Sequence, residues 1–187
     1  MTLSESIIKF FTANIINGLE HLHNLGITHR DLKPWNILID GNYNLKLTDF
    51  GTAKLFNWED DKVKRALSKR QSREKSRSNS PTKKHTFVGT NQYISPEVLK
   101  GLEPSLAIDL WSLGVILYQM YAGWTPFVGD NEMDTYENIC NGKIQRPENI
   151  PNNAWDLIKA LLKIDPTSRI GCSKNSLKID YQVIKSH

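Results

Sequence analysis

The sequence lacks any uninterrupted apolar run of the roughly 20 residues that a helix needs to cross a bilayer. Its N-terminal residues, MTLSESIIKF, also lack the basic region and continuous apolar core of a secretory signal. These absences argue against a membrane span and against secretion through a cleaved signal peptide.

Cysteine is scarce, with only Cys140 and Cys172 in the chain. Two cysteines so far apart cannot build a disulfide framework, and they have no metal-ligand spacing. We therefore expect a reducing intracellular compartment, by default the cytoplasm, with nuclear location or recruitment to a membrane left open.

What the chain does contain is enough apolar material for one soluble globular domain: 187 residues, 39% hydrophobic and 24% charged. Its net charge of +4 is unevenly distributed. Residues 62–84 hold ten Lys or Arg and one acid, which leaves 14 basic and 19 acidic residues, a net charge of −5, in the rest of the chain. The globular part is mildly acidic, and a strongly basic segment interrupts it.

Hydrophobic periodicity predicts a mainly helical fold. Apolar residues recur at steps of three and four from Ile8 to Leu22, which predicts a helix that begins at a Thr2–Glu5 capping box and stops near Gly26. Residues 105–122 are apolar on nearly every face, which is typical of a buried central helix. Residues 154–162 predict a further amphipathic helix.

Two short apolar segments, residues 37–39 and 45–47, flank a turn-rich connection and predict a β-hairpin. From residue 56 to about residue 84 the periodicity vanishes, and serines alternate with basic residues. This composition is typical of a solvated insertion. A regulatory phosphorylated region and an attraction to nucleic acid or acidic membranes are alternatives for the insertion.

The candidate chemistry lies on both sides of the hairpin. His-Arg-Asp-Leu-Lys-Pro-Trp-Asn occupies residues 29–36, and Asp-Phe-Gly occupies residues 49–51. Phosphoryl transfer needs a carboxylate that orients the attacking hydroxyl, for which Asp31 is the candidate, and a cation near the phosphates, for which Lys33 is the candidate. The amide of Asn36 and the carboxylate of Asp49 offer the oxygen ligands that Mg²⁺ prefers.

These two motifs resemble the catalytic and metal-binding loops of eukaryotic protein kinases. The block Thr-Phe-Val-Gly-Thr-Asn-Gln-Tyr-Ile-Ser-Pro-Glu at residues 86–97 resembles the end of a kinase activation segment. The resemblance implies the C-terminal lobe of an α+β kinase domain spanning residues 1–187, in which the hairpin carries the catalytic and metal-binding loops. It also implies ATP and Mg²⁺ as cofactors.

The resemblance further assigns individual roles. Thr90 would bond Asp31 and Lys33, as in serine/threonine kinases, and Leu38 would form the floor under the adenine. The structural roles fall to five residues: His29 and Phe50 in the motifs, Asp109 as the anchor of the catalytic loop, and Glu97 in a buried ion pair with Arg169.

The strings DFGTAKL at 49–55 and TFVGTNQYISPEVL at 86–99 resemble the AGC group, and within it the subfamily of 3-phosphoinositide-dependent protein kinases. This resemblance implies that Thr86 is an activating phosphosite whose phosphate pairs with Arg30 and Lys54. It also implies protein substrates, among them the activation loops of other AGC kinases. A link to phosphoinositide membranes would run only through parts absent from this chain.

The sequence departs from that pattern in three ways, one of which is the basic insertion that lengthens the activation segment. It contains no Gly-rich phosphate loop, strand lysine or partner glutamate of an N-terminal lobe, so we expect a fragment of a larger enzyme that is inactive alone. Trp35 stands where glutamate is usual, which weakens any inference of a basic peptide preference. The alternatives are a truncated lobe that acts as a protein-binding module and, as the least favoured, a nucleic-acid binder.

Overall fold

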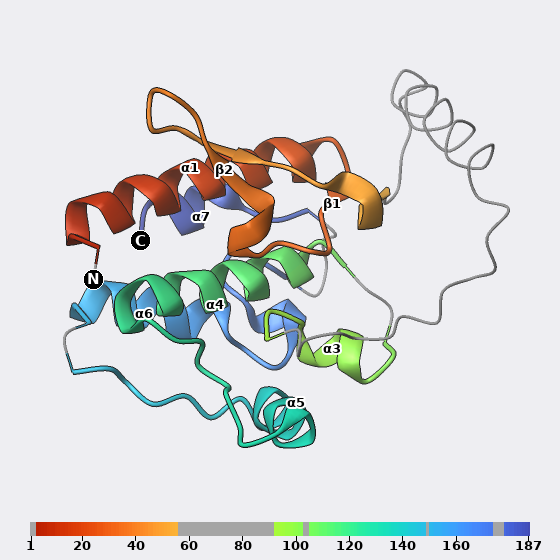
Figure 1. Cartoon of the computed structure of the whole chain (residues 1–187). Coiled ribbons are helices and arrows are strands. Elements are labelled where there is room, and N and C mark those ends of the chain that lie inside the picture. Colours follow the sequence, from red (N-terminus) through yellow and green to blue (C-terminus); the bar gives the residue numbers. More distant parts are fainter. Residues whose placement is uncertain (1–2, 56–91, 103–104, 149, 174–177) are drawn as a thin grey trace, which may run out of the picture.

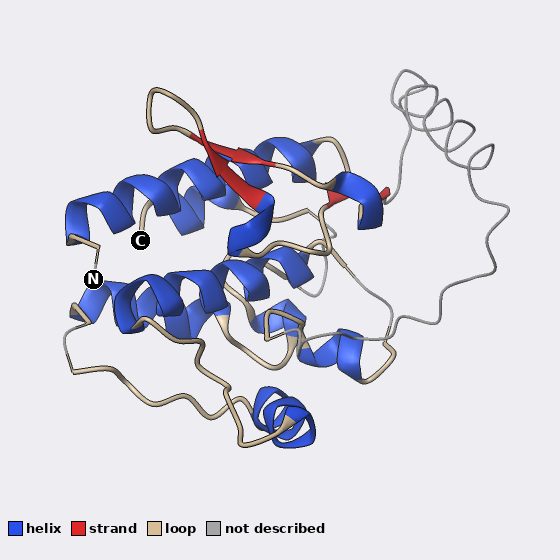
Figure 2. Ribbon diagram, in the orientation of Figure 1, coloured by secondary structure: helices blue, strands red, loops and turns tan. Residues whose placement is uncertain are grey.

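A computed structural model describes residues 3–55, 92–102, 105–148, 150–173 and 178–187 of the chain. Within these ranges, helices dominate and two small antiparallel sheets lie at one side (Figure 1, Figure 2). The basic insertion lies outside the described residues, so the expectation that it is solvated stays a prediction. None of the described helices is long and apolar enough to cross a bilayer.

Helix α1 (Glu5–Asn24) is the expected N-terminal helix, and it buries Ile8, Ile15 and Leu19. It begins two residues later than the sequence expectation, because Ser4 is the N-cap and its hydroxyl accepts a hydrogen bond from the Ile7 amide. The Thr2–Glu5 capping box was therefore wrong. The hydroxyl of Thr2 and that of Ser4 are both suitable for an N-cap by residue type. Ser4 takes the role because it directly precedes Glu5, the first helical residue.

The predicted hairpin forms from β2 (Ile37–Ile39) and β3 (Leu45–Leu47), with Ile37 opposite Leu47. The Asp40 carboxylate accepts the backbone amides of Asn42 and Asn44 at 2.9 Å and so closes the turn. These hydrogen bonds lower the pKa of Asp40 below its ordinary value. A second pair, β1 (Ile27–Thr28) with β4 (Lys54–Leu55), was not expected from the sequence.

Helix α4 (Ala107–Ala122) is the central helix, buried on nearly every face and ended by Gly123 in the left-handed conformation. It packs against α1 on one side and against α6 (Asn152–Leu161) on another (Figure 1). In the α6 region the periodicity places Trp155, Ile158, Leu161 and Leu162 inward. The last three are buried, and Trp155 is partly buried against the core. The loops that carry the motifs pack against this core, to which Asp109 of α4 bonds them.

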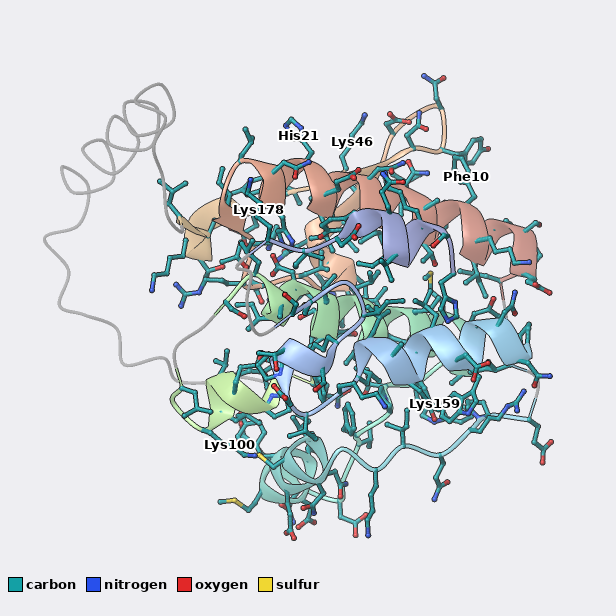
Figure 3. The ribbon with its side chains drawn as sticks, turned by 180° about the vertical axis from the view of Figure 1, so that it is seen from behind. Phe10, His21, Lys46, Lys100, Lys159 and Lys178 are labelled. Atoms are coloured by element: carbon teal, nitrogen blue, oxygen red, sulfur yellow. The ribbon has the colours of Figure 1, made fainter. Side chains whose placement is uncertain are left out.

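The remaining elements are short and lie around this core. They are η1 (Pro34–Asn36), η2 (Phe50–Thr52), α3 (Pro96–Leu99), α5 (Glu132–Asn141), η3 (Pro166–Ser168) and α7 (Tyr181–Lys185). The view from behind shows Phe10, His21 and Lys46 projecting outward along the edge formed by α1 and the hairpin (Figure 3). The motif residues lie instead in the loop between β1 and β2, which leads into the hairpin, and directly after β3, where the chain leaves it.

Candidate active site

Asp31, Lys33 and Asn36 converge in the loop between β1 and β2. The Nζ atom of Lys33 donates to Oδ2 of Asp31 at 2.8 Å. The side-chain amide of Asn36 donates to the same Oδ2 at 3.0 Å and to the backbone oxygen of Asp31 at 2.7 Å. Both contacts to the carboxylate fall on one oxygen, so Oδ1 of Asp31 accepts no hydrogen bond from the described residues.

The Asp109 carboxylate holds this loop by its backbone. Its Oδ2 accepts hydrogen bonds from the His29 amide at 2.8 Å and the Thr28 hydroxyl at 2.9 Å, and its Oδ1 accepts one from the Arg30 amide at 2.9 Å. The ring of His23 supplies a fourth donor at 2.9 Å. Because Asp109 lies on the buried central helix, the loop is anchored to the core of the fold.

The charge of Asp109 is maintained by these donors. Burial raises the pKa of its carboxyl, but the hydrogen bond and charge of His23 and the two backbone amides lower it by more, so the pKa lies below its ordinary value. Arg30 has a positive φ of 70°, a conformation that L residues seldom adopt. The bond from its amide to Asp109 holds the chain in that turn.

His29 links the catalytic loop to the end of the hairpin. Its Nε2 donates to the Thr48 backbone oxygen at 2.8 Å, and its Nδ1 accepts the Asp31 amide at 3.3 Å. The Thr48 amide in turn donates to the Asn36 backbone oxygen at 3.0 Å. The backbone leading into Asp49 therefore runs beside Asn36, although twelve residues separate the two in sequence.

The two expected metal ligands have the donor atoms that Mg²⁺ requires. The amide nitrogen of Asn36 is used by Asp31, and its amide oxygen accepts no hydrogen bond from the described residues. Asp49 is exposed, and within the described ranges its one accepted hydrogen bond comes from the Gly51 amide to Oδ1 at 3.4 Å. Among the described residues no group of three or more His, Cys, Asp or Glu gathers. Two oxygen ligands suit Mg²⁺, which usually keeps several waters.

Phe50 packs against the ring of His29, with centroids 5.1 Å apart, and the Thr52 hydroxyl donates to the His29 backbone oxygen at 3.1 Å. Asp49 itself has a φ of 60°. These contacts fix the turn that carries the Asp49 carboxylate, and they tie it to the same residue that positions Asp31.

Glu97 and Arg169 form a buried bidentate ion pair, with Nη1 to Oε1 at 2.7 Å and Nη2 to Oε2 at 2.6 Å. The guanidinium also donates to the Ala107 and Lys163 backbone oxygens and lies 5.2 Å from the centre of the Trp111 ring. A buried charge pair of this kind needs every donor satisfied. It joins α3 to the segment that follows η3 and to the start of α4.

The contacts among the described residues do not test the roles of the remaining sequence-predicted site residues. Leu38 lies on β2 with its side chain 55% exposed, and its role as the floor under an adenine stays a prediction. Arg30 is exposed, and Lys54 pairs in register with Thr28 on β1. Thr86 and Thr90 lie outside the described residues, and their assigned roles as phosphosite and as partner of Asp31 stay predictions.

Sequence reasoning missed two residues that support the loop. Because the ionised Asp109 carboxylate only accepts, Nε2 of His23 donates to it, and the other ring nitrogen lies 2.7 Å from the Tyr181 hydroxyl. Burial raises the pKa of Tyr181 well above its ordinary value. Neither residue has a local sequence signal, because its partner is 86 or 158 residues away.

Comparison with known proteins identifies the family of the chain. The model of the protein kinase domain matches residues 1–181. The chain is 39% identical over 186 residues to 3-phosphoinositide-dependent protein kinase 1 of Rattus norvegicus and 38% identical over 186 residues to the putative 3-phosphoinositide-dependent protein kinase 2 of Homo sapiens. It is also 38% identical over 183 residues to ribosomal protein S6 kinase beta of Caenorhabditis elegans.

These alignments cover 100%, 100% and 98% of the chain but 29%, 41% and 29% of the three relatives. The chain therefore spans less than half the length of each. The relatives are serine/threonine kinases of the AGC group. On the domain match and on identity along its whole length, the chain belongs to the protein kinase family and is similar to AGC-group serine/threonine kinases.

Proposed function

We propose that this chain carries the catalytic C-terminal lobe of a serine/threonine protein kinase, which transfers the γ-phosphate of ATP to a protein hydroxyl. The observation that supports this most is the convergence of Lys33 and Asn36 on one oxygen of Asp31, on a loop that Asp109 holds from the central helix. The alignments to serine/threonine kinases agree with that chemistry.

Asp31 is the proposed base or orienting group. Its Oδ2 is held by two donors, which fixes the plane of the carboxylate and leaves Oδ1 to accept the proton of an attacking hydroxyl. A base must lie within hydrogen-bond reach of the proton that it takes, and a carboxylate held on one side meets that need without losing rotamer freedom at each turnover.

Lys33 is the proposed phosphate contact. Its ammonium bonds Asp31 and is partly exposed, so it can also reach a phosphate oxygen placed above the carboxylate. A fixed cation at that position offsets the charge that spreads over the transferring group in the transition state.

Asn36 and Asp49 are the proposed Mg²⁺ ligands, through the amide oxygen and the exposed carboxylate. When bound, Mg²⁺ would offset charge on the phosphates of ATP. The contribution of the chain is to position the two ligands. The hydrogen bond from the Thr48 backbone amide to the Asn36 backbone oxygen keeps the two backbone segments side by side.

The finer assignments follow from similarity alone. Substrates that include activation loops of other AGC kinases, and activation by phosphate on Thr86, are proposals that rest on the relatives named above. The chain spans 29% of the rat relative, so activity is proposed for a longer protein that contains these residues.

The test is a radiolabel transfer assay on such a longer protein, with Mg²⁺, ATP and a generic Ser/Thr peptide. Asp31→Asn removes the proton acceptor and should lower kcat by at least about 100-fold, the usual contribution of a positioned base. The matched change Asp156→Asn, on the exposed side of α6, should leave kcat within about twofold. Equal rates for both variants would contradict the proposal.

A further inference from the structure

The side chain of Trp35 is 74% exposed although it lies inside the catalytic loop. It occupies the middle of η1, between Pro34 and Asn36, and Asn36 is buried and bonded to Asp31. The loop geometry that buries Asn36 thus turns the neighbouring indole outward. A large apolar side chain so close to a candidate catalytic carboxylate is exposed at a position that a protein substrate must approach.

The indole is backed by a fixed aromatic ring. The rings of Trp35 and Tyr93 meet edge to face, with centroids 6.5 Å apart and planes at 78°. Tyr93 is held from both ends by α4, since its hydroxyl donates to Gln119 at 2.7 Å and its backbone oxygen accepts the Ser112 hydroxyl at 2.9 Å. The two rings therefore form an aromatic platform whose inner half is rigid.

The surroundings of this platform favour an apolar occupant over a cationic one. Tyr93 also lines a hollow with Ile94, Val98 and Ile108, in which Asp31 is the one carboxylate among the described lining residues. That carboxylate already bonds Lys33 at 2.8 Å. A lysine or arginine of a substrate would meet the ammonium of Lys33 and the nearby Arg30 and would find no unshared carboxylate in this lining.

The other buried acids near the loop are also committed. Both oxygens of Glu97 bond Arg169, and Asp109 accepts four donors. Neither can turn outward without leaving a buried cation or several amides unpaired, a cost of the kind that keeps such groups in place. The acids that the structure describes around the loop therefore give no support to electrostatic pairing with a basic substrate side chain at this position.

We propose that Trp35, backed by Tyr93, is a specificity-determining residue that binds an apolar or aromatic side chain beside the phosphoacceptor Ser or Thr of a protein substrate. This inference rests on the proposed function, because it takes Asp31 as the centre on which the substrate hydroxyl converges. Burial of a substrate phenyl ring against the indole removes apolar area from water on both sides.

The test measures peptide binding to the 187-residue chain by following the indole N–H signals of its five tryptophans, with Trp35 assigned through Trp35→Phe. The probes are serine peptides of one length in which a single Phe, Arg or Ala occupies each position near the serine in turn. A Phe peptide should bind about tenfold more tightly than its Ala counterpart at one position and should shift the Trp35 signal.

Three variants make the result specific. Trp35→Ala should abolish the tenfold preference for Phe, and Trp35→Glu should replace it by a preference for Arg, since a carboxylate supplies the missing partner. The matched change Tyr43→Ala removes an aromatic ring that is 73% exposed in the turn of the hairpin, and it should keep the preference for Phe. Circular dichroism of each variant verifies that the helices remain.

Three results would overturn the inference: a Phe preference that survives Trp35→Ala, a preference of the unaltered chain for Arg, or no binding of any peptide at millimolar concentration. The readout uses neither nucleotide nor turnover. Loss of phosphoryl transfer would therefore count against the proposed function alone, whereas normal transfer without a Phe preference would count against the role of Trp35 alone.

Discussion

The Oδ1 atom of Asp109 lies 2.9 Å from the backbone nitrogen of Arg30, which itself has a φ of 70°. A carboxylate in the first turn of the most buried helix thus holds a strained turn of the loop that carries Asp31. The same carboxylate binds the preceding amide of His29. The geometry of the candidate active site is set from the core outward.

Asp109→Asn should therefore lower the free energy of unfolding by about 3 kcal/mol. The amide can accept only through its oxygen, so at least one of the four buried donors loses its partner, and bonds to a charged group are worth about 1.5–3 kcal/mol each. Urea unfolding followed by circular dichroism measures the change. Asp156→Asn, at an exposed ion pair with Lys159, should produce little change. Equal losses in the two variants would contradict the role of Asp109.

Acid should destabilise the fold through the same carboxyl. The pKa of Asp109 is lower in the folded chain than its ordinary value of 3.8, so its contribution is complete above about pH 4 and is lost as the pH falls from there toward the lowered value. Unfolding free energies measured from pH 5 to pH 2.5 should fall more steeply for the unaltered chain than for Asp109→Asn. Parallel curves would show that another group carries the acid sensitivity.

Those features of the fold that rest on local pattern could be predicted from the sequence. Residues 105–122 are apolar on nearly every face, and residues 107–122 form a helix that is buried on nearly every face. The hairpin at residues 37–47 follows from two apolar segments and an Asp-Gly-Asn turn. The polar helix α5 was not predicted, because it buries only Thr135 and Ile139 and so has almost no apolar face for a pattern to reveal.

For the candidate site too, the residues in local motifs could be predicted and those with long-range contacts could not. The motif residues Asp31, Lys33 and Asn36 could be named because they stand within six positions of one another. The support of His23 and Tyr181 could not, since a histidine near the end of a helix has an ordinary local explanation. Their contacts exist only once α7 has packed against α1, and long-range packing leaves no periodic trace in the sequence.

Removal of one partner of the Glu97–Arg169 pair should be costly. Glu97→Gln leaves the guanidinium buried without its counter-charge, for which about 3 to 5 kcal/mol of stability is expected to be lost. Urea unfolding measures the loss. The matched change Glu20→Gln, at the partly exposed pair with Lys185, should cost far less.

The double variant Glu97→Met with Arg169→Met separates charge from packing. Because it removes both charges together, it should be more stable than Glu97→Gln alone. A double variant less stable than the single one would show that the pair acts mainly through the shape of the guanidinium against Trp111.

Close packing of α4 on α6 gives a further prediction. A methyl group at Gly114 would approach Leu162 to 2.8 Å and Leu161 to 2.9 Å, so Gly114→Ala should destabilise the fold by about 1 to 3 kcal/mol through overpacking. Gly41→Ala, where nothing lies within 4 Å of the added methyl, is the matched control and should be near neutral. Comparable thermal midpoints for the two variants would contradict the close approach of the helices.

The measurement that tests the account most directly is the dependence of ATP affinity on Mg²⁺, by calorimetric titration of a longer protein that contains this chain. If the hairpin brings Asn36 and Asp49 to one metal-bound triphosphate, Mg²⁺ should tighten ATP binding at least about tenfold in the unaltered protein and in Asp156→Asn, and this gain should vanish in Asp49→Asn. An undiminished gain in Asp49→Asn would contradict the account.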